Sequence, residues 1–321
     1  MSAYIIRRLI LLIPTMLIVT IVLFLVIRLM PGNVIELMVL QHSQEQAGEL
    51  QLDEDMIREM MGLNKPIHTQ YFDWVSGIFL RGDFGTSLWT ERTLTEDLRD
   101  RIAVTFELGL LTMIVMNVIG IPIGIYSAIR QDTWLDYVGR SFAILSLATP
   151  AFWLATMLIV YGSIYFNWSP QIEYIPFTVN PLGNLRQLII PAVLIGTAGT
   201  GGMVRFLRTI MLEVLRQDYV RTAWSKGLTE RVIVIKHALR NALIPVITMF
   251  APQVGMLIGG SVIMEQIFCL PGMGRYLLET LTRRDYLLVS GTNLIYGGFA
   301  MFMILLTDLS YAWADPRVRY R

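Results

Sequence analysis

The sequence predicts an all-α, polytopic membrane protein with six transmembrane helices. Of its 321 residues, 54% are hydrophobic and only 16% are charged, and the mean hydropathy is +0.55. This composition is typical of chains that lie mostly within a bilayer. Six apolar runs reach the ~20 residues that a helix needs to cross the hydrocarbon core. They cover residues 9–30, 103–129, 142–166, 188–208, 242–264 and 289–313.

The first apolar run begins close to the N-terminus and lacks the small-residue site at which a signal peptide is cleaved. We therefore interpret residues 1–30 as a retained transmembrane helix. The segment 31–101 follows and carries about half of the 25 acidic residues. Its size suits a small helical cap better than an independent enzyme domain.

The second and third runs contain polar residues and prolines. Glu107 and Asn117 lie in the second run, and polar groups inside membrane helices often mark a pathway. Both are candidate pathway residues, although Glu107 could reach water at the helix end and Asn117 could hydrogen-bond to a neighbouring helix. Gly120 and Gly124 have the spacing of a close helix-packing face. Pro150 predicts a kink in the third run.

The later runs are rich in glycine and bear isolated charges. The link 167–187 predicts an ordered loop or an interfacial hairpin outside the membrane, because proline and aromatic residues are frequent in it. The glycines of IGTAGTGG in the fourth run predict close helix approach, since a phosphate-binding loop would need a preceding strand and a Gly-Lys pair. Glu265 is a third candidate pathway residue or a partner of Arg275. Asp308 is interpreted as a structural ion-pair partner.

The placement of lysine and arginine predicts the orientation of the chain. Most of the 26 basic residues lie at the two termini and in the links that follow the second and fourth runs. Basic links favour the cytoplasmic side of a membrane. Both termini and the segment 209–241 are therefore predicted to be cytoplasmic, and the segment 31–101 extracytoplasmic. The net charge of +1 gives no support for nucleic-acid binding.

The segment 209–241 is the longest basic link and predicts a docking surface for a cytosolic partner. Asp218 is predicted to cap a short helix, and Gly227 to end it. A second helix is expected to begin near Thr229. One apolar face at helical spacing is expected on the first helix, made of Val220, Ala223, Trp224 and Leu228.

The sequence shows no pattern typical of a metal site, a nucleotide site or an enzyme. The three histidines, His42, His68 and His237, are far apart, and the single cysteine, Cys269, excludes an intrachain disulfide. No His-Glu-x-x-His or Walker A pattern occurs. An intramembrane enzyme is therefore disfavoured. A channel or secondary transporter working alone is disfavoured too, because neither inverted repeats nor clear intramembrane charge pairs are evident.

The stretch DYVRTAWSKGL followed by KHALRNALIP resembles the cytoplasmic coupling loop, or EAA loop, of ABC importer permeases, especially the first permease of dipeptide/oligopeptide systems. IRRLILLIPT, GLNKP, RGDFGTSL, GSVIMEQIF with PGMGR, and the terminal ADPRVRY extend the resemblance over essentially the whole chain. The alanine and glycine of the family's loop correspond to Ala223 and Gly227. Arg221 stands at the family's glutamate position, and Trp224 replaces an expected arginine.

The resemblance implies the type I importer (MetI-like) fold, with a five-helix core at 102–313 and a cytoplasmic tail at 314–321. It also implies that the coupling loop docks on ATPase subunits. The residues that this resemblance assigns to coupling are Asp218, Tyr219, Val220, Arg221, Thr222, Ala223, Trp224, Lys226, Gly227 and Leu228.

The function implied is that of a permease subunit in a prokaryotic plasma (inner) membrane, not of an enzyme. It would form half of the path for peptides or similar small solutes and would work by alternating access. The implied partners are a second permease, two ABC ATPase subunits that bind ATP and Mg, and an extracytoplasmic binding protein. No cofactor or metal is expected in this chain. Similar permeases serve oligosaccharides, glutathione and nickel, so these solutes stay open as alternatives.

Overall fold

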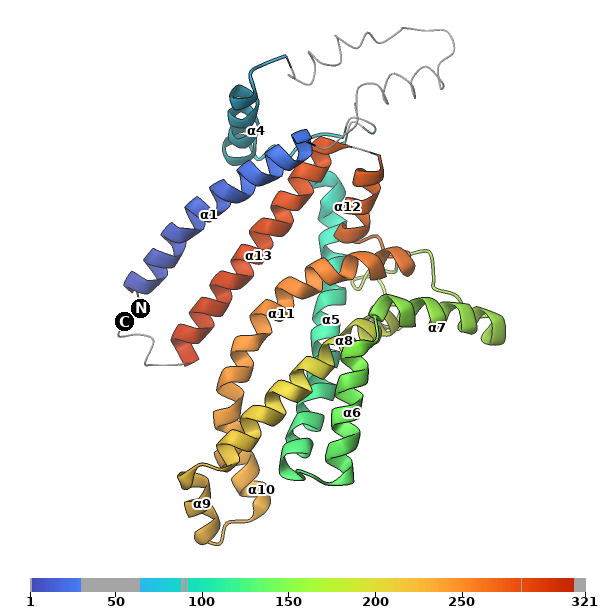
Figure 1. Cartoon of the computed structure of the whole chain (residues 1–321). Coiled ribbons are helices and arrows are strands. Elements are labelled where there is room, and N and C mark those ends of the chain that lie inside the picture. The colour runs from blue at the N-terminus through green and yellow to red at the C-terminus, as the bar shows by residue number, and fades with distance from the viewer. Residues whose placement is uncertain (1, 30–63, 88–89, 91, 284, 315–321) are drawn as a thin grey trace. The chain divides into compact units, whose positions relative to one another are not determined.

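The computed structural model of the protein describes residues 2–29, 64–87, 90, 92–283 and 285–314. Within these residues every regular element is helical, apart from one isolated β-bridge between Thr86 and Thr93. This confirms the all-α fold class. The helices in Figure 1 are α1 (Ser2–Leu29), α4 (Ile67–Arg81), α5 (Leu94–Ile129), α6 (Trp134–Ala148), α7 (Ala151–Phe166), α8 (Pro181–Leu215), α9 (Asp218–Ser225), α10 (Glu230–Val232), the π-helix η1 (Ile233–Leu239), α11 (Arg240–Ile267), α12 (Met273–Thr282) and α13 (Tyr286–Ala314).

Several sequence-based predictions fall outside the described residues. They concern the first half of the predicted segment 31–101, including His42, and the tail from 315 onward. The side chain of Asp308 also lies outside the part of the chain that the structure describes.

Among the described residues, four helices are long and apolar enough to cross a membrane. Their spans are Ile6–Val26, Leu94–Ile129, Pro181–Leu215 and Leu287–Leu306. Helices α6 and α7 together make a further, bent candidate, and the predicted run 242–264 lies within α11. The described helices thus agree with a multi-pass membrane protein, and the count of six spans stays a prediction.

The third predicted span is not one continuous helix. The predicted run 142–166 breaks at Thr149 and Pro150, and the axes of α6 and α7 differ by 89°. The backbone of Thr149 is extended (φ −97°, ψ 119°) because the ring of a following proline disfavours helical geometry. Pro150 then precedes the first residue of α7, where its missing N–H costs nothing. A kink was expected here, and the structure shows a near right angle.

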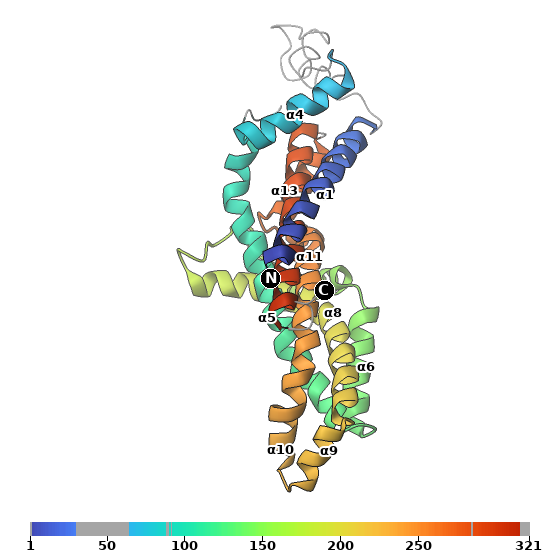
Figure 2. The same cartoon turned by 90° about the vertical axis from the view of Figure 1, so that its left-hand side faces the viewer.

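The chain forms two compact units, which we describe separately. The core unit contains residues 1–6, 100–275 and 300–321, and the second unit contains residues 7–99 and 276–299. In the core unit α8 packs against α6, α7 and α11, and Figure 2 shows α8 running beside α6 and α11. Buried apolar side chains, among them Leu188 and Leu207, line both halves of α8. Helix α8 is therefore the central element of the core unit.

Glycines let the helices of the core unit approach α8 closely. A Cβ atom at Gly120 of α5 would lie 2.9 Å from Cγ of Met203, and one at Gly124 would lie 3.1 Å from Cβ of Leu207. Gly196 of α8 faces α5 in the same way, with a virtual Cβ 3.0 Å from the carbonyl oxygen of Thr112. The packing role predicted for the glycines of both helices is confirmed, except at Gly202, which has no neighbouring atom within 4 Å of a virtual Cβ. No phosphate-binding loop is needed to explain them.

Two adjacent glycines of α8 give a matched test of this packing. A methyl group at Gly201 would overlap the carbonyl oxygen of Ala143 in α6, whereas one at Gly202 would meet nothing within 4 Å. We expect Gly201→Ala to lower the free energy of unfolding by about 1–3 kcal/mol through overpacking. Gly202→Ala should raise it by up to about 1 kcal/mol, because alanine favours helix. Chemical unfolding of the detergent-solubilised protein measures both, and equal stability of the two variants would contradict the close α6–α8 contact.

In the second unit, the loop between α4 and α5 packs against the start of α13. Gly85 has φ +111°, a conformation that favours glycine. A Cβ atom at Gly291 would overlap the carbonyl oxygen of Phe84, so only glycine fits at that contact. The buried Ser87 hydroxyl donates a hydrogen bond to Oδ2 of the buried Asp285 at 2.8 Å. The RGDFGTS stretch is therefore a packed structural loop of this unit.

Candidate functional site

The predicted docking segment lies where α8 ends and α11 begins. Helix α9 starts at Asp218, with Gln217 as the flanking residue, and no side chain caps its first turn. The prediction that Asp218 is the cap is wrong: Asp218 is the first helical residue, and its carboxylate accepts from Nη1 of Arg221 at 3.3 Å. Gly227 has φ +75° just after the helix, so its predicted role in ending α9 is confirmed.

The apolar residues of α9 divide between two sides of the helix. Val220 and Ala223 are buried, 0% and 4% exposed, and pack with Ile233 of η1. Trp224 is 50% exposed and Leu228 is 36% exposed. The prediction of one common apolar face is therefore wrong. Helix α9 uses one side of its surface to pack against η1, and this leaves Trp224 and Leu228 exposed.

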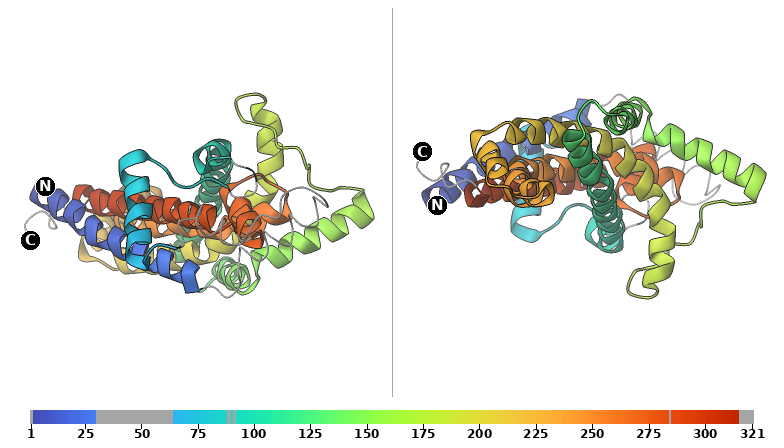
Figure 3. Two further views of the ribbon diagram at one scale, coloured as in Figure 1. Left: turned by 90° about the horizontal axis from the view of Figure 1, so that it is seen from above. Right: turned by 90° about the horizontal axis from the view of Figure 1, so that it is seen from below.

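The exposed side of α9 is both aromatic and basic. Tyr219 is 42% exposed, and its hydroxyl oxygen accepts a hydrogen bond from Nδ2 of Asn241 in α11 at 2.8 Å. Thr222 is exposed, and its hydroxyl bonds to the backbone of Asp218. Further exposed cations line the segment: Arg221, Lys226, Arg231, Lys236 and Arg240. We call Tyr219, Arg221, Trp224, Lys226 and Leu228 the outer face of α9; Figure 3 (right) views this end of the core unit.

The chain returns from α9 to the core through a π-helix. The predicted second helix near Thr229 begins at Glu230, as α10, and continues as η1 and α11. Ile233, Val234 and Ala238 of η1 are buried. A π-helix forms hydrogen bonds between residues five apart in the sequence, whereas an α-helix joins residues four apart. This wider repeat places residues 233 and 238 on the same buried side.

Two ion pairs near this end were not predicted from the sequence. Arg130, in the turn after α5, bonds to Glu230 of α10 through Nη1–Oε1 at 2.8 Å and Nη2–Oε2 at 3.2 Å. Arg208 of α8 donates to both carboxylate oxygens of Asp136 in α6, at 2.8 and 2.6 Å. The Asp136 side chain is fully buried and that of Arg208 is 18% exposed. The partners are distant in sequence, so no local pattern joins them.

Glu107, the first candidate pathway residue, ties a loop to the helices. Its Oε2 accepts from the Tyr174 hydroxyl at 2.6 Å and from Nδ2 of Asn184 in α8 at 2.9 Å. Burial, together with the hydrogen bond to Glu107, raises the pKa of the Tyr174 phenol well above its usual range. The phenol therefore keeps its proton and remains a donor. In this conformation Glu107 anchors the predicted ordered loop 167–187.

Asn117 makes no interhelical hydrogen bond to any residue that the structure describes. Its Nδ2 donates to the carbonyl oxygen of Met113, one turn earlier in α5, at 2.7 Å. Its buried Oδ1 has no hydrogen-bond partner among the described residues. The interhelical interpretation is therefore wrong for this conformation, because the amide is satisfied on one side by its own helix.

Glu265 is fully buried at the end of α11. Its Oε1 accepts from the hydroxyls of Thr105 at 2.8 Å and Ser261 at 2.9 Å, and its Oε2 accepts from the backbone N–H of Arg275 at 3.0 Å. A Cβ atom at Gly272 would overlap the carboxylate. The PGMGR turn thus wraps around Glu265, and the carboxylate fixes this turn to α5. A pathway role for Glu107, Asn117 and Glu265 stays a prediction.

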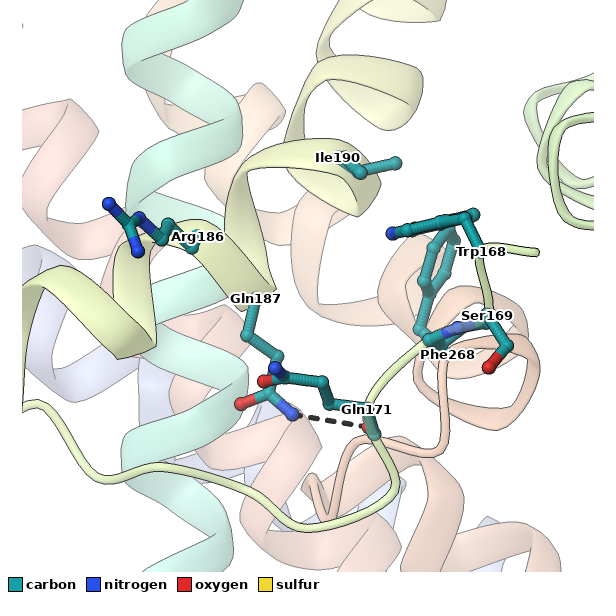
Figure 4. Close-up of a pocket in the computed structure, with 8 residues that line it drawn as sticks. Trp168, Ser169, Gln171, Arg186, Gln187, Ile190 and Phe268 are labelled. Atoms are coloured by element: carbon teal, nitrogen blue, oxygen red, sulfur yellow. Dashed lines mark hydrogen bonds between the residues drawn. The ribbon is translucent and has the colours of Figure 1, made fainter. Parts of the chain in front are cut away.

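A pocket of about 170 Å³ lies beside the loop that Glu107 anchors. Figure 4 shows Trp168 and Phe268 on one side of it and Arg186 and Gln187 on the other. Gln187 also holds the loop, since its Nε2 donates to the carbonyl oxygens of Gln171 at 3.2 Å and Glu173 at 3.0 Å. The lining mixes aromatic, amide and cationic groups.

The described residues contain no group of three or more His, Cys, Asp or Glu side chains that could hold a metal ion. Of the two histidines in that part of the chain, His68 is exposed, and His237 accepts a hydrogen bond from Asn241 through its backbone oxygen. Nothing in this geometry provides a catalytic constellation.

Known proteins resemble this chain along its full length. A family model described as binding-protein-dependent transport system inner membrane component matches residues 120–320, and the model for the N-terminal part of such components matches residues 1–109. A protein of Brucella abortus (strain 2308), named for a peptide transport system permease, is 38% identical over 320 residues, with 100% of both chains covered. The glutathione transport system permease protein GsiC of Salmonella choleraesuis is 35% identical over 321 residues, again with 100% of both covered.

Among solved structures, the inward-facing MetNI methionine ABC transporter aligns with a TM-score of 0.46 and 18% sequence identity. The alignment covers 70% of this chain and 94% of that chain. This likeness is too distant to bear on the function.

Proposed function

Because the chain belongs to the family of binding-protein-dependent transport system inner membrane components, we propose that it forms half of the membrane path of an importer for short peptides, glutathione included. The chain is a permease subunit of an ATP-driven ABC importer, in the inner membrane, and not an enzyme. ATP is hydrolysed by separate ATPase subunits, and the solute is delivered by a binding protein. The other half of the path would come from a second, similar permease.

The observation that carries this proposal is the sequence identity, 38% and 35% over the full length, to relatives named for peptide and glutathione transport. Glutathione is itself a small peptide, so both names point to the same chemical class of solute. No feature of the described residues favours an oligosaccharide or nickel. In particular, no metal-ligand group occurs there that would bind a nickel ion directly.

The outer face of α9 supports a docking role. It presents an exposed tryptophan and several cations on a short helix at the end of α8. We propose that this face is cytoplasmic and inserts into a groove on an ATPase subunit, with Trp224 as its anchor, because large aromatic side chains dominate binding energy at interfaces. Helix α8 and the segment η1–α11 would then transmit movement of the ATPase pair into the membrane and alternate the access of the path.

The test combines purification and crosslinking. We expect the tagged protein, isolated from its native membrane in mild detergent, to bring a second permease and ABC ATPase subunits with it. In a Cys269→Ser background, Trp224→Cys should crosslink to the ATPase, because this side chain is exposed, whereas a cysteine at the buried Ala223 would be hidden. Ile172→Cys, 82% exposed in the loop after α7, is the matched control on the predicted opposite side of the membrane.

Crosslinking at position 172 but not at 224 would contradict the proposed orientation and the docking role together. Purification of the chain without any ATPase, with no crosslink at either position, would favour a transporter that works alone.

A further inference from the structure

Besides its packing on η1, the docking segment has a polar contact with the turn between α5 and α6. We call residues 130–133 the α5–α6 turn. Its first residue, Arg130, meets Glu230, the first residue of α10, through two parallel N–H···O contacts at 2.8 and 3.2 Å. A guanidinium and a carboxylate held in this forked geometry resist rotation as well as separation. The ion pair therefore fixes both the distance and the direction between the turn and α10.

The α5–α6 turn is itself rigid. The Thr133 hydroxyl donates to the carbonyl oxygen of Arg130 at 2.6 Å, and the Thr133 backbone N–H donates to the same oxygen at 3.2 Å. Asp132 has φ +60°, and its backbone N–H donates to Oδ2 of Asp136 at 3.1 Å. The turn is thus held from both ends. A displacement of Arg130 must carry the whole turn with it.

The buried end of this chain of contacts is the Asp136–Arg208 ion pair. Asp136 accepts hydrogen bonds from both the turn and Arg208 of α8. The covalent chain runs from α8 through α9 to α10, and the polar contacts run from Glu230 through the turn and Asp136 back to Arg208. Together they close a ring. Helix α9 is the part of this ring that lies between α8 and α10.

We propose that Arg130 and Glu230 are positioning residues that make the α5–α6 turn move as one body with the docking segment. Force applied at α9 would then reach α5 and α6 directly, in addition to α8 and α11. This inference rests on the proposed docking of α9. It assigns a role to Arg130, which lies outside the predicted coupling loop, and to Glu230, which lies within that loop but is not among the residues that the resemblance assigns to coupling.

The exposure of the pair separates this role from a structural one. The side chains of Arg130 and Glu230 are 47% and 41% exposed. Such surface pairs contribute little to folding stability, because water and salt screen them. Reversing one charge should leave the fold intact and loosen only the link between the two elements.

The experiment measures one distance in the assembled, detergent-purified transporter. Spin labels are placed at Gln131→Cys in the turn and Ser225→Cys in α9, both exposed, in a Cys269→Ser background. The distance between them is recorded without nucleotide and with ATP, Mg and vanadate. With the native pair we expect one narrow distance distribution, unchanged between the two states. With Arg130→Glu or with Glu230→Arg alone, the distribution should broaden and shift between states.

The charge-swapped double variant, Arg130→Glu with Glu230→Arg, should restore the narrow, state-independent distribution. Asp73→Lys is the matched control, because it reverses the charge of an exposed ion pair, with Lys65 at 2.6 Å, in the second unit. The control should leave the distribution as it is. Thermal unfolding of each variant shows whether the fold is retained.

The inference would be overturned by a distance that changes between states with the native pair, by single reversals with no effect, or by a double variant whose distribution stays broad. A single variant that does not fold would also overturn it, since the pair would then be structural. If the ATPase is absent from the purified protein, this result contradicts the proposed docking of α9 but not the proposed link between the α5–α6 turn and the docking segment. If the ATPase is bound and the distance still changes between states, only the link fails.

Discussion

Replacing Ala223 with aspartate is expected to abolish ATP-driven uptake while the protein inserts into the membrane at the normal level. Ala223 is 4% exposed and packs with Val220, Ile233 and Leu215. An aspartate there would place a charge in an apolar contact with no cation beside it, at a cost of about 3 kcal/mol or more. Helix α9 would then separate from η1. Insertion depends on the apolar spans, which the substitution leaves unchanged.

The measurement is uptake by reconstituted vesicles together with ATP hydrolysis by the same preparation. We expect uptake to fall at least about tenfold, the loss that corresponds to 1.4 kcal/mol, while hydrolysis continues. Ser225→Asp is the control, because it adds the same charge to an exposed position two residues away. Gly227→Pro should uncouple as Ala223→Asp does, since proline cannot adopt the φ of +75° found there. Normal uptake by Ala223→Asp would refute α9 as the element that transmits force.

Replacing Asp136 with alanine is expected to be the most destabilising single change in the core unit. Arg208 donates to both oxygens of this carboxylate, which is fully buried. Without Asp136 the mostly buried guanidinium would keep its charge and lose its partner. Breaking a buried pair in this way costs about 3–5 kcal/mol. The backbone N–H of Asp132 would lose its acceptor as well.

Chemical unfolding of the purified protein measures this loss. The matched control is Asp73→Ala, which removes the exposed ion pair with Lys65 and should cost at most about 1 kcal/mol. Restoration by Asp136→Glu would show that the charge matters more than the exact length of the side chain. If Asp136→Ala and Asp73→Ala unfold alike, the buried pair does not hold α6 to α8.

The regular parts of this fold were predictable because they follow from local sequence. Apolar runs long enough for a bilayer indicated the membrane helices, and the glycines at 120, 124, 196 and 201 indicated where helices approach closely. The end of α9 at Gly227 followed from the preference of the left-handed conformation for glycine. Each of these signals lies within a few residues of the feature that it predicts.

Features that depend on distant partners were not predictable. Ala223 and Trp224 have similar places in an apolar pattern, and only the contact of α9 with Ile233 of η1 decides that the first is buried and the second exposed. The polar partners of Glu107 lie in a loop and in α8, far along the chain, so the sequence did not reveal that this side chain anchors the loop. A basic link between apolar runs predicted a docking surface, but the ATPase as its partner came from family resemblance, because composition does not identify a partner.

The π-helix has a consequence for how this gene can change in length. Residues 233 and 238 lie on the same buried side only because each hydrogen bond of η1 joins residues five apart, whereas those of an α-helix join residues four apart. A deletion or insertion of one residue in α8 would turn everything beyond it by about 100° around the helix axis. In η1 the same change would be absorbed locally, by converting π turns into α turns or the reverse. The segment between α9 and α11 is therefore where one residue can be inserted or deleted while the membrane helices stay in register.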